Sequence, residues 1–391
     1  MPWLRVVGNT RVAGQRALFL IMLTPFEISS QRSACSMSSG IFSGPARRVF
    51  QLDPLQDPRW KSFVSTHPDA SVFHHVDWLK ALKSCYGYEP IALTLTPPES
   101  PLENGMALCE VRSPLTGNRL VSIPFSDHCE PLVNDSKELE TLVADLTARV
   151  ENSDLKYFEL RPILHSLDDK KNLGVSQNYY FHRLDLRPSE HTLFKKFHKD
   201  SVQRKIRRAE RERLRYQQGN SEHLLLHFYK LMILTRKRQG LPPQPLKWFR
   251  TVLSCMGKNA QIRVAFKETT PIASILTLTT KRSLVYKYGC SDPTFSNLGG
   301  TALLFWNAIQ QAKADGIEEL DMGRSDIVNT GLITFKKRWG AELIPINYWR
   351  YPRRAASSNP ERLIRYVKKL ISNAPDQALV ILGNLLYRHV G

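Results

Sequence analysis

The stretch SDPTFSNLGGTALLFW, residues 291–306, decides the fold. It follows a short apolar run that is typical of a strand, residues 284–289, and it opens a stretch with helical apolar spacing that continues to about residue 315. Gly299 and Gly300 stand between the two, where glycines permit a ligand to approach backbone N–H groups closely. Because the N-terminus of a helix favours anions, one interpretation is a phosphate-binding loop. The stretch has neither G-x-G-x-x-G nor a P-loop Gly-Lys-Ser/Thr, so a tight structural turn is the other interpretation.

Working outward, apolar periodicity predicts two halves with the same order of elements: helices, a series of strands, a helix and a strand. This order predicts an α+β fold. In the first half we expect helices at 59–66, 75–85 and 136–150, and strands at 91–96, 106–111, 120–125, 157–161 and 179–186. In the second half we expect two helices over 190–216, further helices at 221–238, 245–256, 300–315 and 330–338, and strands at 261–266, 272–278, 284–289, 319–322 and 342–348.

Length and composition agree with a folded chain of two domains. The chain has 391 residues, of which 42% are hydrophobic and 23% charged, which excludes a mostly disordered chain or a fibrous one. The longest uninterrupted apolar run, Ala17 to Leu23, has seven residues, whereas a membrane-spanning helix needs about 20. We therefore expect no segment that crosses a bilayer.

The net charge of +19 is concentrated in three segments. Residues 1–50 hold six basic residues and one acid, residues 195–215 hold ten and three, and residues 353–391 hold seven and two. Such segregation indicates anionic partners at these places, namely phosphates, nucleic acid or an acidic membrane surface. We interpret the internal segment, with Arg204 and Arg208, either as a phosphate-binding ridge or as a solvated helix.

Cysteine and histidine spacing gives no sign of a metal site. The six cysteines form no C-x-x-C pair, and no histidine cluster has zinc spacing, so we predict free thiols and no bound metal. The string SDHCE at residues 126–130 concentrates polar side chains. It has three interpretations: a polar loop that lines a cleft, a structural turn, or, least favoured, a metal site.

Two further strings carry candidate chemistry. DMGRSD at 321–326 follows a short predicted strand, and GLITFKKRWG at 331–340 comes next. Lys336 lies in the second string, on a short helix, where a lysine in a cleft can stabilise a developing oxyanion. We expect such a lysine to lie outside the core, so that its removal changes stability little.

Several strings, in this order and spacing, resemble a known family. They are ASVFHHVDWLKAL at 70–82 with GYEP at 87–90, PFSDHCEPL at 124–132, RKIRRAE at 204–210, YKYG at 286–289, LGG at 298–300, DMGR at 321–324 and GLITFKKRWG at 331–340. Over residues 50–352 the chain resembles the FemAB-like transferases, a branch of the GNAT acyltransferase superfamily. The resemblance implies two tandem GNAT-like domains, each a mixed, mostly antiparallel sheet flanked by helices.

The resemblance also implies an activity. Some members of the family transfer an amino acid from aminoacyl-tRNA to a peptidoglycan precursor, and other branches resemble acyl-CoA-dependent N-acyltransferases associated with exopolysaccharide machinery. We therefore expect a transferase that moves an acyl or aminoacyl group to an amine of a cell-envelope polysaccharide or peptidoglycan precursor, lipid-linked or nucleotide-linked. Acyl-CoA or aminoacyl-tRNA is the expected donor, with no bound cofactor. The alternative is a non-catalytic module that binds RNA or an anionic membrane through its basic segment.

Site residues follow from the same strings. Lys336 matches a lysine that serves catalysis in the bridge-forming members of the family. A base must also take the amine proton, and Asp292 and Asp326 are candidates, although such residues more often cap helices or turns. The expected donor-binding residues are Asn297, Gly299, Gly300, Tyr288 and Arg324, and the expected phosphate-binding residues are Arg204 and Arg208.

The predicted organisation has four parts. Residues 1–48 are an extension outside the fold, 49–188 the first GNAT-like domain, 189–352 the second with the catalytic cleft, and 353–391 an amphipathic tail that either docks on anionic lipid or packs on the second domain. For the first 36 residues we keep three interpretations: an upstream extension with translation starting at Met37, an unfolded tail, or a signal peptide. We expect the protein in the cytoplasm, with a possible position at the inner face of the membrane.

Overall fold

The computed structural model describes residues 48–165, 167, 173–353, 368 and 370–390. Residues 1–47 of the predicted extension 1–48 and most of the first apolar stretch of the tail lie outside these residues. Within the described part of the chain, no helix has the length and hydropathy to cross a bilayer.

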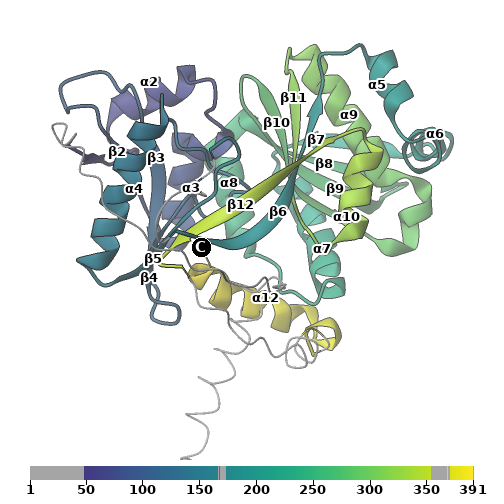
Figure 1. Ribbon diagram of the computed structural model, residues 1–391. Coiled ribbons are helices and arrows are strands. Elements are labelled where there is room, and N and C mark those ends of the chain that lie inside the picture. Colours follow the sequence, from purple (N-terminus) through teal and green to yellow (C-terminus); the bar gives the residue numbers. More distant parts are fainter. Residues whose placement is uncertain (1–47, 166, 168–172, 354–367, 369, 391) are drawn as a thin grey trace, which may run out of the picture.

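One twisted sheet of twelve strands runs through the described chain (Figure 1). Its strand order is β1-β2-β3-β4-β5-β12-β6-β11-β10-β9-β8-β7. The first six strands are β1 (Phe50–Leu52), β2 (Glu89–Thr94), β3 (Met106–Val111), β4 (Asn118–Val121), β5 (Leu155–Leu160) and β6 (Gly174–Asp185). The other six are β7 (Arg215–Gly219), β8 (Ala260–Lys267), β9 (Thr270–Thr279), β10 (Ser283–Ser291), β11 (Glu319–Asp326) and β12 (Glu342–Tyr351).

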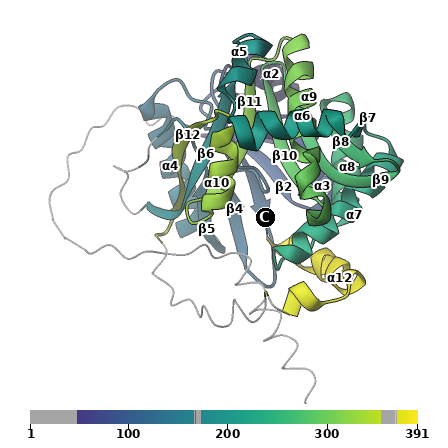
Figure 2. The same cartoon turned by 90° about the vertical axis from the view of Figure 1, so that its right-hand side faces the viewer.

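Helices cover both faces of this sheet (Figures 1 and 2). The α-helices are α2 (Pro58–Thr66), α3 (Val76–Tyr86), α4 (Ser136–Glu151), α5 (Glu190–Lys196), α6 (Arg204–Arg211), α7 (Glu222–Arg238), α8 (Leu246–Met256), α9 (Gly300–Ala314), α10 (Thr330–Arg338) and α12 (Asp376–Leu386). Short helical turns include η1 (Val72–His74), the π-type η2 (Lys199–Gln203) and the 3₁₀ turns η3 (Gly257–Asn259), η4 (Pro293–Leu298) and η5 (Tyr387–His389).

The two halves repeat one arrangement of strands and helices. In the first half β4, α4 and β5 form a parallel strand pair joined by a helix, and in the second half β10, α9 and β11 do the same. The other neighbouring strands of the sheet run antiparallel. The predicted α+β class, with two tandem halves of mostly antiparallel strands, is confirmed.

The halves share their central strands, a feature that the sequence pattern does not show. β12 comes from the end of the chain but lies between β5 and β6, and β6 in turn pairs with β11. β12 therefore extends the sheet of the first half, although it belongs to the second half in the sequence. β6 likewise extends the sheet of the second half, although it belongs to the first half in the sequence. A boundary near residue 188 remains a proposal.

Local predictions were mostly confirmed, and their errors have physical causes. The helix at 330–338 is observed with the predicted bounds, and Asp57 caps α2 by accepting a hydrogen bond from the Arg59 backbone N–H. The helix expected up to residue 216 ends at Arg211, and Arg213 then takes a positive φ of 52°. The chain there turns into β7, which pairs with β8. β7 reads RYQQG, and this polar composition hides the strand because it shows no apolar alternation.

Two apolar clusters hold the sheet from opposite faces. The larger cluster joins the halves, because Trp78 on α3 packs edge-on against Trp248 on α8, with ring centroids 5.2 Å apart. The second cluster lies under α9 and α10 and includes Leu320 and Met322 of β11. Since successive side chains of a strand alternate between faces, Asp321 points to the first cluster's side.

Helix α12 spans the two halves at one end of the molecule (Figure 1). The Tyr88 hydroxyl of the first half donates a hydrogen bond to the Tyr387 carbonyl (3.0 Å), and Arg119 donates to the carbonyl of His389 (2.9 Å). On the second half, Gly383 packs directly on Pro243. In the described part of the tail, one face of α12 therefore packs on the body of the protein.

We predict that Gly383→Ala loosens this contact. A methyl group at residue 383 would lie 2.0 Å from the Pro243 carbonyl oxygen, which is backbone and cannot rotate away. Overpacking of this kind costs about 1–3 kcal/mol, equivalent to a fall of several degrees in the thermal midpoint measured by calorimetry. Gly331→Ala in α10 is the matched control, because its nearest neighbour is the Asn329 side chain at 3.8 Å. Equal midpoints for the two variants would contradict this account of α12.

Candidate active site

The site begins where two parallel strands separate. β10 and β11 pair only over Ser283–Val285 and Glu319–Asp321. Beyond these residues the register of β10 against β9 shifts between Tyr286 and Tyr288, and that of β11 against β6 shifts after Asp321. Such irregularities bend a strand away from its neighbour. The two strands therefore diverge and leave a gap that connects the two faces of the sheet.

Asp127, from the first half of the chain, fills this gap. A Cβ atom added to Gly323 of β11 would lie 3.0 Å from Asp127 Oδ2 and 3.8 Å from the Tyr286 carbonyl oxygen of β10. Gly323 also has a φ of +69°, a conformation that L-residues with side chains rarely adopt. The glycine of DMGR therefore lets β11 bend and lets a carboxylate from the other half enter.

Cations surround the Asp127 carboxylate. Lys287 Nζ donates a hydrogen bond to Oδ2 (2.9 Å), and Arg324 Nε lies 3.7 Å from Oδ1. The Arg324 guanidinium in turn lies over the rings of Tyr179 (4.1 Å) and Tyr348 (4.9 Å). Burial opposes the charged carboxylate, but Lys287 and Arg324 outweigh it and hold the pKa of Asp127 below its usual value. Asp127 is thus a buried anion fixed in position.

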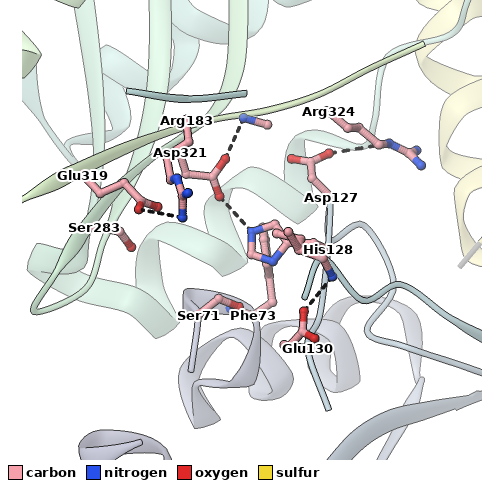
Figure 3. A network of polar contacts seen from close by, with 12 residues as sticks. Ser71, Phe73, Asp127, His128, Glu130, Arg183, Ser283, Glu319, Asp321 and Arg324 are labelled. Atoms are coloured by element: carbon pink, nitrogen blue, oxygen red, sulfur yellow. Dashed lines mark hydrogen bonds and ion pairs between the residues drawn. The ribbon is translucent and has the colours of Figure 1, made fainter. Parts of the chain in front are cut away.

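Beside Asp127, His128 forms a buried pair with Asp321 (Figure 3). His128 Nε2 lies 3.0 Å from Asp321 Oδ2, and Asp321 Oδ1 accepts a hydrogen bond from the Gly323 backbone N–H (2.6 Å). The imidazole ring is held edge-on between Phe73 and Phe181, at 5.4 and 5.0 Å. With Nε2–H donating to Asp321, the lone pair of neutral His128 lies on Nδ1. The arrangement is that of an oriented general base.

The charge of Asp321 acts on the proton affinity of His128. Burial disfavours the imidazolium, but the hydrogen bond to Asp321 and the carboxylates of Asp127 and Glu130 together raise the pKa of His128 above 6.5. A base with such a pKa is matched to proton transfer near neutral pH.

His128 and Asp321 form part of the wall of a cavity of about 1220 Å³. Both halves contribute to this cavity, through residues 64–72 of the first half and the β9–β10 hairpin, residues 279–283, of the second. Glu130 fixes the loop at residues 163–165, which forms another part of the wall. Its carboxylate accepts hydrogen bonds from the backbone N–H groups of these residues. The loop at 126–130 therefore lines a cleft, as one of its three interpretations predicts.

Lys336 lies at the gap, as part of α10. Its Nζ donates hydrogen bonds to the carbonyls of Gly323 (2.9 Å) and Arg324 (2.8 Å), which β11 leaves unpaired where it bends. Burial lowers the pKa of Lys336 from 10.5 to about 8, against the opposing charges of Asp127 and Asp321. Only 2% of Lys336 is exposed, so the expectation of a lysine outside the core was wrong. Its removal would leave two carbonyls without partners and would cost stability.

The other two predicted catalytic residues, Asp292 and Asp326, stabilise turns by accepting hydrogen bonds from backbone N–H groups. Asp292 caps η4 by accepting a hydrogen bond from the Thr294 backbone N–H (2.9 Å), and Asp326 accepts one from the Val328 backbone N–H (3.1 Å). Neither is among the charged groups that act on Lys336 or His128. Both therefore occupy the cap and turn positions that such residues most often take.

The predicted donor-binding residues divide between core and surface. Arg324 lies at the gap, whereas Tyr288 is buried in the first apolar cluster, where its hydroxyl accepts a hydrogen bond from Trp248 Nε1 (3.0 Å). Asn297 is exposed in η4, one turn before α9. Gly299, with a φ of +84°, and Gly300 form the entry to α9.

The predicted phosphate-binding helix packs against this entry. A Cβ atom at Gly299 would lie 2.1 Å from the Lys205 carbonyl oxygen, so the start of α9 touches α6. Arg204 and Arg208 of α6 are exposed and form ion pairs with Asp200 (3.5 Å) and Glu212 (2.7 Å). The structure thus brings the basic helix and the glycine turn together.

Sequence reasoning missed three residues at the gap: Asp127 and Lys287, which pair there, and Asp321 as the partner of His128. DMGR and SDHCE were both noted as polar strings, but nothing in a single sequence shows that residues 193 positions apart meet. Among the described residues, no group of three or more His, Cys, Asp or Glu side chains has the geometry to hold a metal ion.

Comparison with known proteins shows which domain family and which solved structures the chain is similar to. Residues 196–337 match the family model described as an acetyltransferase (GNAT) domain. The fold is similar to the crystal structure of FemX, with 12% identity and a TM-score of 0.62 over 82% of this chain and 100% of that one. It is also similar to a tandem GNAT protein from the clavulanic acid biosynthesis pathway, with 10% identity and a TM-score of 0.50 over 79% and 99% of the two chains. No curated protein matches the chain.

At such low identity the solved structures show the fold alone, whereas the domain match covers β10, β11, α9, α10 and Lys336. Asp127 and His128 lie before the matched residues, in the half that completes the site. The second half of the chain therefore matches a GNAT acetyltransferase domain, and the fold of the whole described chain is similar to that of FemX and of a tandem GNAT protein.

Proposed function

We propose that the protein transfers an acyl group from acyl-CoA to an amine of a cell-envelope precursor, with His128 as the base that takes the amine proton. One observation carries the proposal. The His128–Asp321 pair lies both in the wall of the large cavity and at the last paired residue of β11, where the strand gap opens. A substrate in the cavity and a donor at the edge of the gap would meet next to this pair.

The two faces of the sheet suggest separate places for donor and acceptor. Lys336, Gly299 and Gly300 belong to elements on the α9–α10 face, and His128 approaches the gap from the other face. We place the donor on the α9–α10 side, with its phosphates near the glycine turn and the cations of α6, Arg204 and Arg208. Arg324, Tyr288 and Asn297 then remain the candidates for further donor contacts.

The acceptor amine enters through the cavity. Next to His128 the cavity wall holds the carboxylates of Glu130, Glu319 and Asp321, of which Glu319 pairs with Arg183 (3.7 Å), and we expect these carboxylates to attract the ammonium group of the acceptor. His128 Nδ1 takes a proton from this ammonium, and the free amine nitrogen attacks the thioester carbonyl carbon. One hydrogen of Lys336 Nζ is not used by the two β11 carbonyls, and it stabilises the oxyanion that forms.

The remaining steps conserve atoms and charge. The tetrahedral intermediate collapses with cleavage of the carbon–sulfur bond, and the amide forms as the thiolate of CoA leaves. His128, which has passed the ammonium proton to solvent, takes the second proton from the attacking nitrogen and gives it to the thiolate, so that the products are an amide, free CoA and one proton released to solvent. No oxidant, reductant or metal enters the balance.

The nature of the substrates rests on two further arguments. We prefer acyl-CoA to aminoacyl-tRNA as donor because the matched domain is an acetyltransferase domain. The acceptor, a lipid-linked or nucleotide-linked precursor of peptidoglycan or exopolysaccharide, rests on the resemblance to FemAB-like transferases. Such precursors are assembled in the cytoplasm, at the inner face of the membrane, and we place the reaction there.

The proposal predicts that His128→Gln abolishes most turnover without unfolding the protein. Glutamine keeps a polar side chain near Asp321 but cannot take a proton, so we expect kcat to fall by about 10²–10⁴-fold. The measurement is release of free CoA thiol from acetyl-CoA in the presence of a panel of amino-sugar and peptide amines, with the thermal midpoint as a check of folding. His191→Gln, an exposed histidine on α5, is the matched control and should keep full turnover.

Full turnover of His128→Gln would remove His128 from the mechanism. If neither protein releases thiol with any amine while both bind RNA with steep salt dependence, the alternative of a non-catalytic module replaces the proposal.

The pH profile gives an independent prediction. His128 must be neutral to accept a proton, and its raised pKa places the acidic limb of kcat/KM above pH 6.5. Lys336 must be charged to stabilise the oxyanion, and its pKa of about 8 places the basic limb near pH 8. Activity should therefore have an acidic limb above pH 6.5 and should fall beyond pH 8. A rate that keeps rising from pH 8 to pH 10 would contradict the role of Lys336.

A further inference from the structure

Helix α12 carries an apolar face that the body does not cover. Its buried side, with Leu379 and Leu386, packs on the rest of the chain. On the opposite side Ile381 is 60% exposed and Leu385 is 52% exposed. Residues four positions apart share one face of a helix, so these two side chains form one stripe. Leu370, in the segment that precedes α12, is a further large apolar side chain with 53% exposure.

The charged residues near this stripe in the sequence are mostly positive. Asp376, the single acid between residues 368 and 391, forms an ion pair with Lys237 (2.9 Å). Lys368 and Arg388 are exposed, and so is Arg238, which lies close to the Gly240–Lys368 contact in sequence. Over residues 353–391 the chain has seven basic residues and two acids. An exposed apolar stripe with basic flanks is typical of a helix that lies in the interface of an anionic membrane.

The contacts of α12 with the rest of the protein suit a role in membrane binding. The helix touches the first half through Tyr88 and the second through Pro243, and it lies at one end of the molecule beneath both halves (Figures 1 and 2). A surface that holds α12 would therefore hold the whole body in a fixed orientation.

We propose that the Ile381–Leu385 face of α12 docks on an anionic membrane surface. The apolar side chains enter the headgroup region, and the basic residues neutralise lipid phosphates. Charge complementarity favours this partner over a second copy of the chain, because two copies would bring the same cations together. The inference goes beyond acyl transfer, since it concerns binding and holds whether or not the proposed reaction occurs.

Sedimentation with vesicles tests the proposal on the full chain. We expect the wild type to pellet with vesicles of phosphatidylcholine and phosphatidylglycerol, to pellet at least tenfold less with phosphatidylcholine alone, and to be released by high salt. The double variant Ile381→Glu, Leu385→Glu should lose at least tenfold in apparent affinity, because it places two like charges at the lipid surface. Leu226→Glu is the matched control, since Leu226 on α7 is also 52% exposed, and it should bind like the wild type.

Three results would overturn the proposal. The wild type fails to pellet with anionic vesicles, the double variant pellets as well as the wild type, or gel filtration shows a wild-type dimer that the double variant converts to a monomer. The last result would assign the stripe to a second copy. Equal thermal midpoints of the wild type and the double variant are required, so that loss of binding is not loss of folding.

Discussion

The early end of the pairing between β10 and β11 is the constraint on which the rest of the structure depends. Three residues of each strand pair, and then both strands bend apart. An open gap in a sheet leaves backbone groups without partners, which is costly unless other groups bind them. Here Lys336 Nζ donates hydrogen bonds to two carbonyls of β11, and Asp321 accepts a hydrogen bond from the Gly323 N–H. Asp127 fills the space between the strands. The polar residues of the site are therefore also the residues that make the gap stable.

This constraint explains why both halves are needed. Asp127 and His128 come from the first half, and their partners Lys287 and Asp321 come from the second. β6 and β12 fix the halves in one sheet, and the Trp78–Trp248 contact fixes them through the helices. A charge pair across such a junction keeps a short, buried geometry only if the junction is rigid. The shared strands provide that rigidity, and the cavity forms on the line where the halves meet.

Much of the fold is visible in the sequence, because its elements depend on local periodicity and caps. Helix α10 and the glycine turn before α9 are examples. The pairing of β6 with β11 and of β12 with β5 could not be predicted from the sequence, because strand partners far apart in the chain leave no local signal. The pairing of His128 with Asp321 escaped for the same reason. Asp292 and Asp326 were chosen because they stand near the key strings, yet each binds backbone within two residues.

The central claim is that the gap between β10 and β11 is where donor and acceptor meet. A crystal structure of the protein with CoA bound tests it most directly. We expect the CoA sulfur to lie at the edge of the gap next to Gly323, on the side of Lys336, with the diphosphate at Gly299 and Gly300. CoA bound at another place, with its sulfur out of contact with Lys336, would contradict it.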